Sequence, residues 1–324
     1  MKAIQKVLVI KLGGVGEMVL AFPAFERIRQ AHPRAKITLL TTDPFVALAK
    51  SSPFFNAVEA DGAPKDPGHW TALILRIRRA HYDRVYDLQN DSASNLIFQA
   101  LRPAPPGWSG TALGASLPHR NRRRGEMHPL ERQAEQLEDA GIWPDAPTKR
   151  WSAAPPDISW ILAKSPQPRS VTVPGAHRPV VLLAPGADAH HPEQRWPPEQ
   201  YGGFARRMQD AGFDIVIIGA LGESGLAHAI QRHAPRARDL TGRTDLVQIA
   251  ALGARSALAV GTDLGVLHLI AAAGAPTIVL FSSDIDAAAV APRGRVSIVH
   301  AATLKALPIE SVMSAAQILA RAPA

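Results

Sequence analysis

The sequence predicts an α/β protein of two domains, each built on a doubly wound parallel sheet. Three observations favour this class. Short apolar runs alternate with helical patterns in both halves of the chain, which is typical of strand–helix–strand units. A proline-rich stretch separates the two halves. The chain has 324 residues, enough for two domains that each bury a core of their own.

The first half carries the alternation up to residue 101. Apolar spacing over 16–32 predicts a helix that Pro23 should kink. Strands are expected over 6–12, 36–42, 57–60 and 84–88, with further helices over 44–50, 70–81 and 92–101. Residues 103–129 are rich in Pro, Gly, Ser and Arg, so we expect long loops around one short strand before a helix over 130–140.

The second half begins the alternation again after the proline-rich stretch. We place a first domain over 1–165, a linker over 166–179 and a second domain over 180–324. A last helix over 309–320 either closes the second domain or packs back on the first. The other expected elements are strands over 180–184, 214–219, 257–262 and 277–281, and helices over 199–211, 221–233, 245–252 and 265–273.

Composition excludes several classes of site. The chain has no cysteine, so disulfides, zinc–thiolate sites and thiol nucleophiles are ruled out. Its net charge of +8 and pI of about 10.1 favour an anionic partner, either nucleic acid, a phosphorylated glycolipid or a membrane surface. A generic basic surface explains the charge equally well. The first apolar run is too short for a signal peptide, and no run approaches the roughly 18 residues that span a bilayer. We therefore expect a cytoplasmic protein.

A glycine-rich turn follows the first strand. Gly13, Gly14 and Gly16 would let a ligand approach the backbone at a helix start, where free N–H groups attract an anion. A dinucleotide fingerprint would need glycine where Val19 stands, and no Gly-Lys-Ser/Thr follows, so neither pattern is complete. The alternative is a tight turn with glycines for packing.

Glu17 lies one residue beyond this turn. At the mouth of a site, its carboxylate could act as a general base that takes a proton from an acceptor hydroxyl. The structural alternative is that a carboxylate in the first helical turn interacts favourably with the helix dipole, which is worth about 0.3–1 kcal/mol.

Residues 260–268 form a second strand-to-helix turn. Thr262 or Asp263 can cap the helix, and the cap alone could explain the aspartate. A cap does not explain His268, one turn further on. Because a helix start binds anions, we favour a diphosphate site at Gly265, with the imidazole of His268 meeting part of the charge.

Three further clusters were weighed. Arg195 beside Trp196 could clamp a phosphate, although a tryptophan alone is more often core. Asp284 and Asp286 lack an evident third ligand, so no metal is expected. An arginine cluster is either a solvated loop or a clamp for a phosphorylated acceptor or acidic membrane surface. It has no interleaved aromatic residues, so we expect no nucleic-acid partner. Its members are Arg120, Arg122, Arg123 and Arg124.

Four segments together resemble the lipopolysaccharide heptosyltransferase family (glycosyltransferase family 9). The first runs from Val7 through Leu-Gly-Gly-Val-Gly-Glu-Met to Ala24. The others are Met127-His-Pro-Leu-Glu-Arg-Gln, Gln194-Arg-Trp-Pro-Pro-Glu-Gln-Tyr and Gly261-Thr-Asp-Leu-Gly-Val-Leu-His. Their order and spacing cover nearly the whole chain.

The resemblance implies a GT-B fold, two Rossmann-like domains facing across a cleft, and an inverting transfer without metal or cofactor. The implied donor is a nucleotide sugar, typically ADP-heptose, bound mainly by the second domain. The implied acceptor is a phosphorylated glycolipid, the lipid A core, bound mainly by the first, with possible peripheral contact at the inner membrane. Position 17 would be the base. The implied donor site comprises Gly14, Gly186, Gln194, Arg195, Glu223 at the ribose, Thr262, Asp263, Gly265, Val266, Leu267 and His268.

The chain departs from the family pattern at three positions. Glu17 stands where the family usually has aspartate, Gln194 where it usually has lysine, and Leu267 where it has serine or methionine. Two alternatives to a glycosyltransferase were considered. A relative that binds a nucleotide sugar or glycan without turnover is favoured by Gln194, and a nicotinamide-dependent oxidoreductase is disfavoured by Val19.

Overall fold

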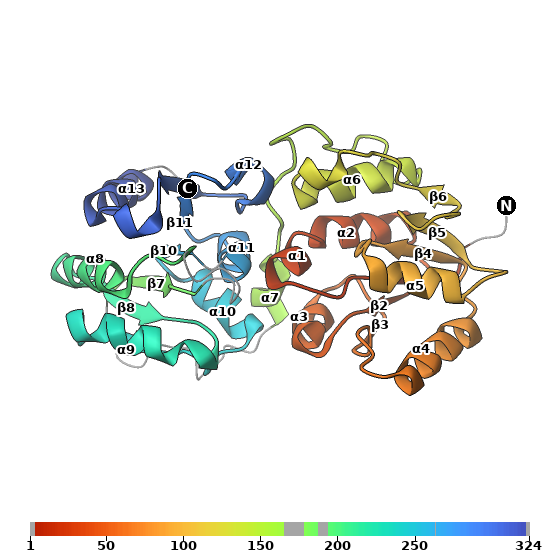
Figure 1. The fold of residues 1–324 in the computed structure, drawn as a ribbon, viewed down its shortest axis with the longest axis horizontal. Coiled ribbons are helices and arrows are strands. Elements are labelled where there is room, and N and C mark those ends of the chain that lie inside the picture. The colour runs from red at the N-terminus through yellow and green to blue at the C-terminus, as the bar shows by residue number, and fades with distance from the viewer. Residues whose placement is uncertain (1–3, 165–177, 187–193, 263, 322–324) are drawn as a thin grey trace. The chain divides into compact units, whose positions relative to one another are not determined.

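A computed structural model describes residues 4–164, 178–186, 194–262 and 264–321 (Figure 1). The chain divides into two compact units, Met1–Ala153 and Ala154–Ala324. Each unit contains one parallel sheet.

The first unit has a six-stranded sheet in the order β3-β2-β1-β4-β5-β6. Val9 in β1 pairs with Leu39 in β2 and with Tyr86 in β4, so the N-terminal strand lies at the centre. Its residues Val7–Ile10 are fully buried, as expected for a strand covered on both faces. The strands are β1 (Lys6–Ile10), β2 (Lys36–Leu40), β3 (Ala57–Glu59), β4 (Arg84–Asp87), β5 (Gly107–Gly110) and β6 (Leu117–Pro118).

Helices cover both faces of this sheet. Two of them, α4 and α5, pack with Leu8, Ile10 and Trp108 on one face, while α2 and α6 contact each other on the other (Figure 1). Asp91 begins α5 with a capping box in which its side chain accepts from the Ser94 N–H. The helices are α1 (Val15–Val19), α2 (Phe22–Ala31), α3 (Val46–Ser51), α4 (Pro67–Ala80), α5 (Ser92–Ala100) and α6 (Pro129–Asp139).

The kink expected at Pro23 is a complete break. One helix ends at Val19 and the next begins at Phe22, with Pro23 in its first turn. Proline is well placed there because the first turn needs no N–H donor, whereas it would remove a hydrogen bond inside a continuous helix. The short helix α1 therefore belongs to the loop after β1.

The second unit repeats the strand order of the first. Its sheet is β12-β11-β10-β7-β8-β9, all parallel, so the strand that is first in sequence again lies beside the fourth. The strands are β7 (Val180–Ala184), β8 (Asp214–Ile217), β9 (Arg238–Asp239), β10 (Leu258–Gly261), β11 (Thr277–Ser282) and β12 (Val296–Ala301).

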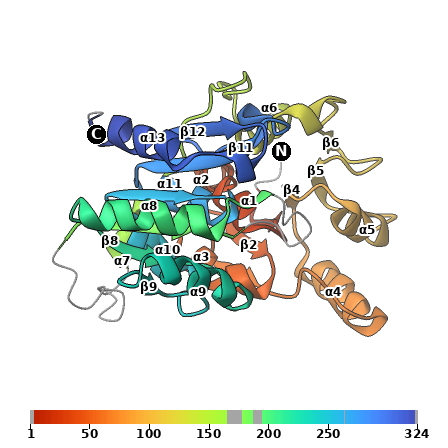
Figure 2. The ribbon, with the colours of Figure 1, turned by 60° about the vertical axis from the view of Figure 1, so that its left-hand side comes forward.

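The helices of this unit form two layers. One layer contains α8, α9 and α13, which share an apolar core with Val181, Leu183 and Val260, and Figure 2 brings this layer forward. The last helix contacts α8, β11 and β12, so it closes the second unit. The helices are α7 (Ser159–Lys164), α8 (Pro198–Asp210), α9 (Ser224–His233), α10 (Leu246–Gly253), α11 (Leu264–Ala272), α12 (Ala287–Val290) and α13 (Ile309–Arg321).

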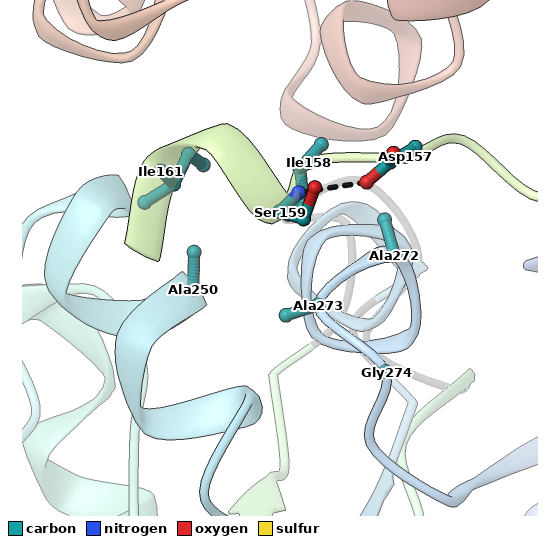
Figure 3. A pocket seen from close by; sticks show the side chains of 8 residues that line it. All are labelled: Asp157, Ile158, Ser159, Ile161, Ala250, Ala272, Ala273 and Gly274. Atoms are coloured by element: carbon teal, nitrogen blue, oxygen red, sulfur yellow. Dashed lines mark hydrogen bonds between the residues drawn. The ribbon is translucent and has the colours of Figure 1, made fainter. Parts of the chain in front are cut away.

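The boundary between the units falls earlier than the linker proposed at 166–179, of which 166–177 lie outside the described residues. The reason is α7, which packs on α10 of the second unit, with Ile158 and Ile161 buried. Figure 3 shows Ile161 and the small side chains of Ala250, Ala272 and Ala273 around a gap of about 240 Å³. Residues 154–164 therefore group with the second unit.

The predicted class of two doubly wound parallel sheets is confirmed, and the missed elements are short or weakly patterned. Strands β6 and β9 have two residues each, and α12 has four, which is too few for a periodic signal. Strand β12 was missed because its residues are only half-buried at an edge of the sheet, and they mix polar and apolar types. The loops over 103–129 hold two strands where one was expected.

Trp196 anchors the core of the second unit. It is 1% exposed, contacts the rings of Tyr201 and Phe204, and donates from Nε1 to the Leu307 carbonyl at 2.9 Å. We expect Trp196→Ala to lower the free energy of unfolding by about 3–5 kcal/mol because it leaves a cavity and an unpaired carbonyl. Denaturant unfolding measures this. The control Leu221→Ala, at a residue 74% exposed, should change it by less than about 0.5 kcal/mol.

Candidate functional site

The strand order places one crevice in each unit. When neighbouring parallel strands send their connections to opposite faces of a sheet, a crevice opens at their carboxyl ends. In the first unit these strands are β1 and β4, and in the second they are β7 and β10. Most of the residues singled out from the sequence lie at the carboxyl ends of these strands.

Glu17 lies at the crevice of the first unit. Its Oε2 forms an ion pair with Lys11 Nζ at 2.7 Å. The Glu17 side chain is 45% exposed while that of Lys11 is 1% exposed. The carboxylate therefore stands at the surface and is held from beneath. Gly14, at the start of the helix with φ of 69°, lies against it, since an added Cβ would be 3.3 Å from Glu17 Cγ.

Lys11 continues the line of β1 into the interior. Its ammonium also reaches the Leu88 carbonyl after β4, at 3.4 Å. Burial lowers the pKa of Lys11, and the neighbouring Glu17 carboxylate opposes that shift. A buried ammonium needs a partner of opposite charge, and Glu17 supplies it. This ion pair fixes the position of the candidate base.

Asp87 is the last residue of β4 and is fully buried. Burial raises the pKa of its carboxyl to about 6, although the backbone N–H of Asn90 favours the charged form. Its Oδ1 accepts from that N–H at 2.9 Å and from the Gln89 N–H at 3.1 Å. The carboxyl thus holds the loop after β4, whose Gln89 side chain in turn accepts from the Leu12 N–H at 2.9 Å.

Helix α6 ties this loop to the neighbouring strand. Gln136 donates from Nε2 to the Asp87 carbonyl at 2.8 Å and accepts from Asn90 Nδ2 at 2.8 Å. Asn90 Oδ1 accepts from the Thr111 N–H after β5, also at 2.8 Å. These bonds are buried or nearly so, and they place one side of α6 against the carboxyl edge of the sheet.

His119, just after β6, belongs to a second hydrogen-bond network, which includes Glu135 of α6. Arg124 donates from Nε to His119 Nδ1 at 3.2 Å, and His119 Nε2 lies 2.6 Å from Glu135 Oε2. Because a guanidinium can only donate, Nδ1 accepts in the first contact, and Nε2–H donates to Glu135 in the second. Asn121 Nδ2 donates to the same carboxylate at 2.9 Å. This network fixes the position of the Arg124 side chain.

Two partly buried arginines, Arg132 and Arg124, interact electrostatically with groups of this crevice. Burial lowers the pKa of Arg132, and the Glu17 charge opposes the shift. Burial also lowers the pKa of Arg124, as does the charge of Arg132. The arginine cluster singled out from the sequence is thus divided, because Arg124 belongs to the crevice while its three neighbours are exposed. These exposed residues are Arg120, Arg122 and Arg123.

In the second unit, Thr262 joins the ends of β7 and β10. It is 7% exposed and donates from Oγ1 to the Gly186 carbonyl at 2.8 Å. Since its proton is used there, Tyr201 is the donor in the 3.3 Å contact between the two hydroxyls. Thr262 is therefore a structural residue of this crevice.

Glu223 lies against glycine backbone in the same crevice. Its Oε2 accepts from the Ala220 N–H at 2.9 Å. A Cβ on Gly186 or on Gly219 would collide with its carboxylate. The two glycines therefore leave the space that Glu223 occupies at the ends of β7 and β8.

Helix α11 begins at this edge, directly after β10. Gly265 and Val266 are half-buried in its first turn. Leu267 is 0% exposed, so its side chain belongs to the core and only its backbone faces the helix start. His268 is 7% exposed. Asp263 lies outside the described residues, and its role stays a prediction.

Gln194 and Arg195 line a hollow of about 570 Å³ with Ser282, Asp284 and Lys305. Its cationic side chains come from the start of α8 and from the loop after β12. Lys305 was not expected from the sequence. Asp286, the partner of Asp284 in the Asp-x-Asp pair, caps α12 by accepting from the Ala288 N–H at 3.0 Å.

Sequence reasoning missed much of the polar shell around Glu17. A signal existed for part of it, because the segment over 127–133 had been noted for its resemblance without any of its residues being placed in a site. A buried Lys directly after an apolar strand was a second signal. The missed residues are Lys11, Asp87, His119, Arg132, Glu135 and Gln136.

The described residues contain neither a metal-binding cluster nor a membrane-spanning helix. No group of three or more His, Asp or Glu side chains in those residues is arranged to hold a metal ion. None of the helices described is both long enough and apolar enough to cross a membrane.

Comparison with protein families identifies the class of enzyme. Residues 70–310, more than half of the chain, match the model of Glycosyltransferase family 9 (heptosyltransferase). The chain belongs to this family. The resemblance inferred from four sequence segments is thereby confirmed, and the chain is a glycosyltransferase.

Individual relatives agree with the family. Lipopolysaccharide heptosyltransferase 2 of Escherichia coli (strain K12) is 28% identical over 299 residues, covering 86% of this chain and 82% of that protein. Lipooligosaccharide heptosyltransferase 2 of Haemophilus ducreyi (strain 35000HP / ATCC 700724) is 25% identical over 288 residues, covering 84% and 81%. The solved structure of E. coli ADP-heptose lps heptosyltransferase II has a TM-score of 0.80, covers 98% of each chain and is 21% identical, which supports the GT-B fold.

Asp87 should make stability depend on pH. Its carboxyl ionises near pH 4 in the unfolded chain and near pH 6 in the folded one, so the folded state binds the extra proton between these values. The stability it contributes is complete below about pH 4 and is lost as pH rises through about 6. Asparagine does not titrate, so the free energy of unfolding of Asp87→Asn, measured relative to that of the native chain, should rise by up to about 3 kcal/mol from pH 4 to pH 7.

Denaturant unfolding at both pH values measures this gain. Asp139→Asn, at an exposed position, is the matched control and should show little change. A difference between Asp87→Asn and the native chain that is the same at pH 4 and 7 would contradict the assignment.

Proposed function

We propose that this chain is an inverting heptosyltransferase that moves heptose from ADP-heptose to a lipopolysaccharide core acceptor. The observation that carries the proposal is Glu17, a half-exposed carboxylate held by the buried Lys11 at the crevice of the first unit. In a member of glycosyltransferase family 9, a carboxylate in that position has the chemistry of a general base. The names of the relatives supply the donor and the acceptor class.

The reaction balances with Glu17 as the base. The acceptor hydroxyl gives its proton to Glu17 while its oxygen attacks the anomeric carbon of the heptose. The bond from that carbon to the diphosphate oxygen breaks, and ADP leaves from the opposite face. Attack opposite the leaving group inverts the anomeric centre. General base catalysis of this kind contributes about a hundredfold to ten-thousandfold in rate.

The second unit is proposed to hold the donor. The start of α11, at Gly265 and Val266, offers backbone N–H groups to a diphosphate. Arg195 and Lys305 line the adjoining hollow and would meet the same negative charge. Glu223, in the turn that follows β8, would accept from ribose hydroxyls. His268 and Asp263 remain proposed donor contacts, as do Gln194 and the backbone of Leu267.

The first unit is proposed to hold the acceptor. Arg132, which interacts with the Glu17 charge, and Arg124, which interacts with Arg132 and Asp87, are partly buried and would bind a carboxylate or phosphate of the sugar core. Arg120, Arg122 and Arg123 form an exposed extension of the same charge. An acceptor anchored in lipid would bring the enzyme to the cytoplasmic face of the inner membrane.

A relative that binds without turnover is the second candidate, favoured by Gln194 in place of the usual lysine. Lys305 can replace the positive charge that is missing at position 194, because it lines the same hollow as Gln194. We therefore prefer the active transferase. Membership of the family removes the oxidoreductase alternative.

Replacing the base tests the proposed chemistry. Glu17→Gln should lower kcat by about a hundredfold to ten-thousandfold, because the amide cannot take the acceptor proton. The KM for ADP-heptose should change little. Release of ADP in the presence of lipid A core acceptor is the measurement, and Glu17→Asp, which keeps the carboxylate, should retain far more activity. Native kcat in Glu17→Gln would rule out the proposed base.

Replacing Gly186 tests the proposed donor site. A methyl group on this residue collides with the Glu223 carboxylate, so Gly186→Ala should weaken ADP binding by about tenfold or more. Thermal unfolding with increasing ADP reports the affinity. Gly222→Ala is the matched control, since a Cβ there meets nothing within 4 Å. Equal ADP affinity in both variants would place the nucleotide elsewhere.

A further inference from the structure

The outer side of α4 and α5 carries exposed leucines that the fold does not use. Leu75 on α4 is 42% exposed and Leu96 on α5 is 52% exposed. Each helix turns other apolar residues toward the sheet, Leu73 and Ile77 in α4 and Ile97 with Phe98 in α5. Leu75 is two residues from both Leu73 and Ile77, so it points away from the sheet.

A loop between β5 and β6 adds a third leucine to this side. Leu113 is 86% exposed, and its carbonyl accepts from Gln99 Nε2 of α5 at 3.5 Å. Arg102, just after α5, lies beside this loop, because a Cβ on Gly114 would come within 2.6 Å of its Nη2. We call this surface the outer leucine surface. It comprises Leu75, Leu96 and Leu113 together with Arg78, Arg79 and Arg102.

Arginines join the parts of this surface. Arg78 at the end of α4 donates to the carbonyls of Ala100 at 2.6 Å and Arg102 at 3.2 Å, so the ends of α4 and α5 are adjacent. Figures 1 and 2 both show α4 and α5 next to each other along one side of the first unit. Arg79 and Arg102 are exposed on the same side.

The segments that form this surface contain no acidic residue. Residues 67–82, which include α4, have no Asp or Glu, and neither do residues 92–125, which include α5 and the Leu113 loop. The nearby carboxylates lie outside these two ranges: Asp83 lines a hollow with Arg78 and Arg102, and Asp61 is paired with Arg76. Exposed leucines among an excess of arginines are the chemistry that binds an anionic lipid bilayer. The leucines enter the region between headgroups and acyl chains, and the arginines meet lipid phosphates.

We propose that the outer leucine surface docks the first unit on an anionic membrane. The inference rests on the proposed function, since a lipid-anchored acceptor gives the enzyme a reason to bind a bilayer. It places the contact on α4, α5 and the Leu113 loop and not on the arginines at 120–124, which then serve the acceptor. The sugar core extends from the bilayer, so Glu17 need not touch lipid.

Vesicle flotation tests the surface directly. The full chain should float with vesicles of phosphatidylcholine mixed with phosphatidylglycerol and stay behind with phosphatidylcholine alone. Leu96→Ser with Leu113→Ser should weaken binding by about tenfold, because two apolar side chains no longer enter the bilayer. Arg79→Gln should weaken it by about fivefold, and raised salt should do the same in the native chain.

Matched variants in the second unit are the controls. Leu221→Ser with Ile318→Ser removes two residues that are 74% and 68% exposed, and Arg206→Gln removes an exposed arginine. These should float like the native chain. Equal binding by the Leu96/Leu113 variant and its control would overturn the proposal, as would loss of binding only in Arg122→Gln with Arg123→Gln.

Transfer to a delipidated, water-soluble acceptor separates this proposal from the proposed function. The Leu96/Leu113 variant should keep native transfer to that acceptor while losing transfer to acceptor in vesicles. Native transfer to both acceptors would overturn the membrane surface and leave the function standing. Absence of transfer to either acceptor by the native chain would overturn the proposed function itself.

Discussion

The ion pair between Lys11 and Glu17 is the interaction on which the first half of the site depends. A lysine that is 1% exposed at the end of a central strand cannot stay without a compensating charge, and the residue that supplies it is the candidate base. The buried ammonium holds the carboxylate at the surface through the 2.7 Å contact between Lys11 Nζ and Glu17 Oε2. Asp87 and Arg132 add further charges that act on Lys11, and Arg124 interacts with both of them, so the polar shell is arranged about one contact.

A repeated strand order accounts for the presence of two such sites. Both sheets place their first strand beside their fourth, so both open a crevice at the carboxyl ends of those strands. In the first unit the crevice holds charged side chains, led by Glu17. In the second it holds glycine backbone at Gly186, a helix start at Gly265 and the carboxylate of Glu223. The same architecture thus carries the proposed base in one unit and the proposed anion-binding backbone in the other.

The fold was largely predictable from sequence because parallel strands covered on both faces are apolar runs, and the amphipathic helices between them have a clear period. Edge elements such as β9 and β12 escaped because they are short or half-buried. Glu17 and the turn at 260–268 could be found since each follows a strand at a glycine-rich helix start. Arg132 lies in the segment over 127–133 that resembles the family, but nothing in that segment indicated its role. Glu135 and Lys305 could not be found, because they reach the crevices from elements distant in sequence.

Family membership and local geometry bear on different parts of the account. The family identifies a glycosyltransferase, and the relatives point to ADP-heptose and a lipopolysaccharide acceptor. The hydrogen bonds and ion pairs are the basis for the roles proposed for individual side chains. The most direct test of the central claim is to incubate the native chain with ADP-heptose, with and without lipid A core acceptor, and to measure released ADP and acceptor-bound heptose together. The account predicts equal amounts of both, only when acceptor is present. No ADP release with acceptor, or the same release without it, would contradict it.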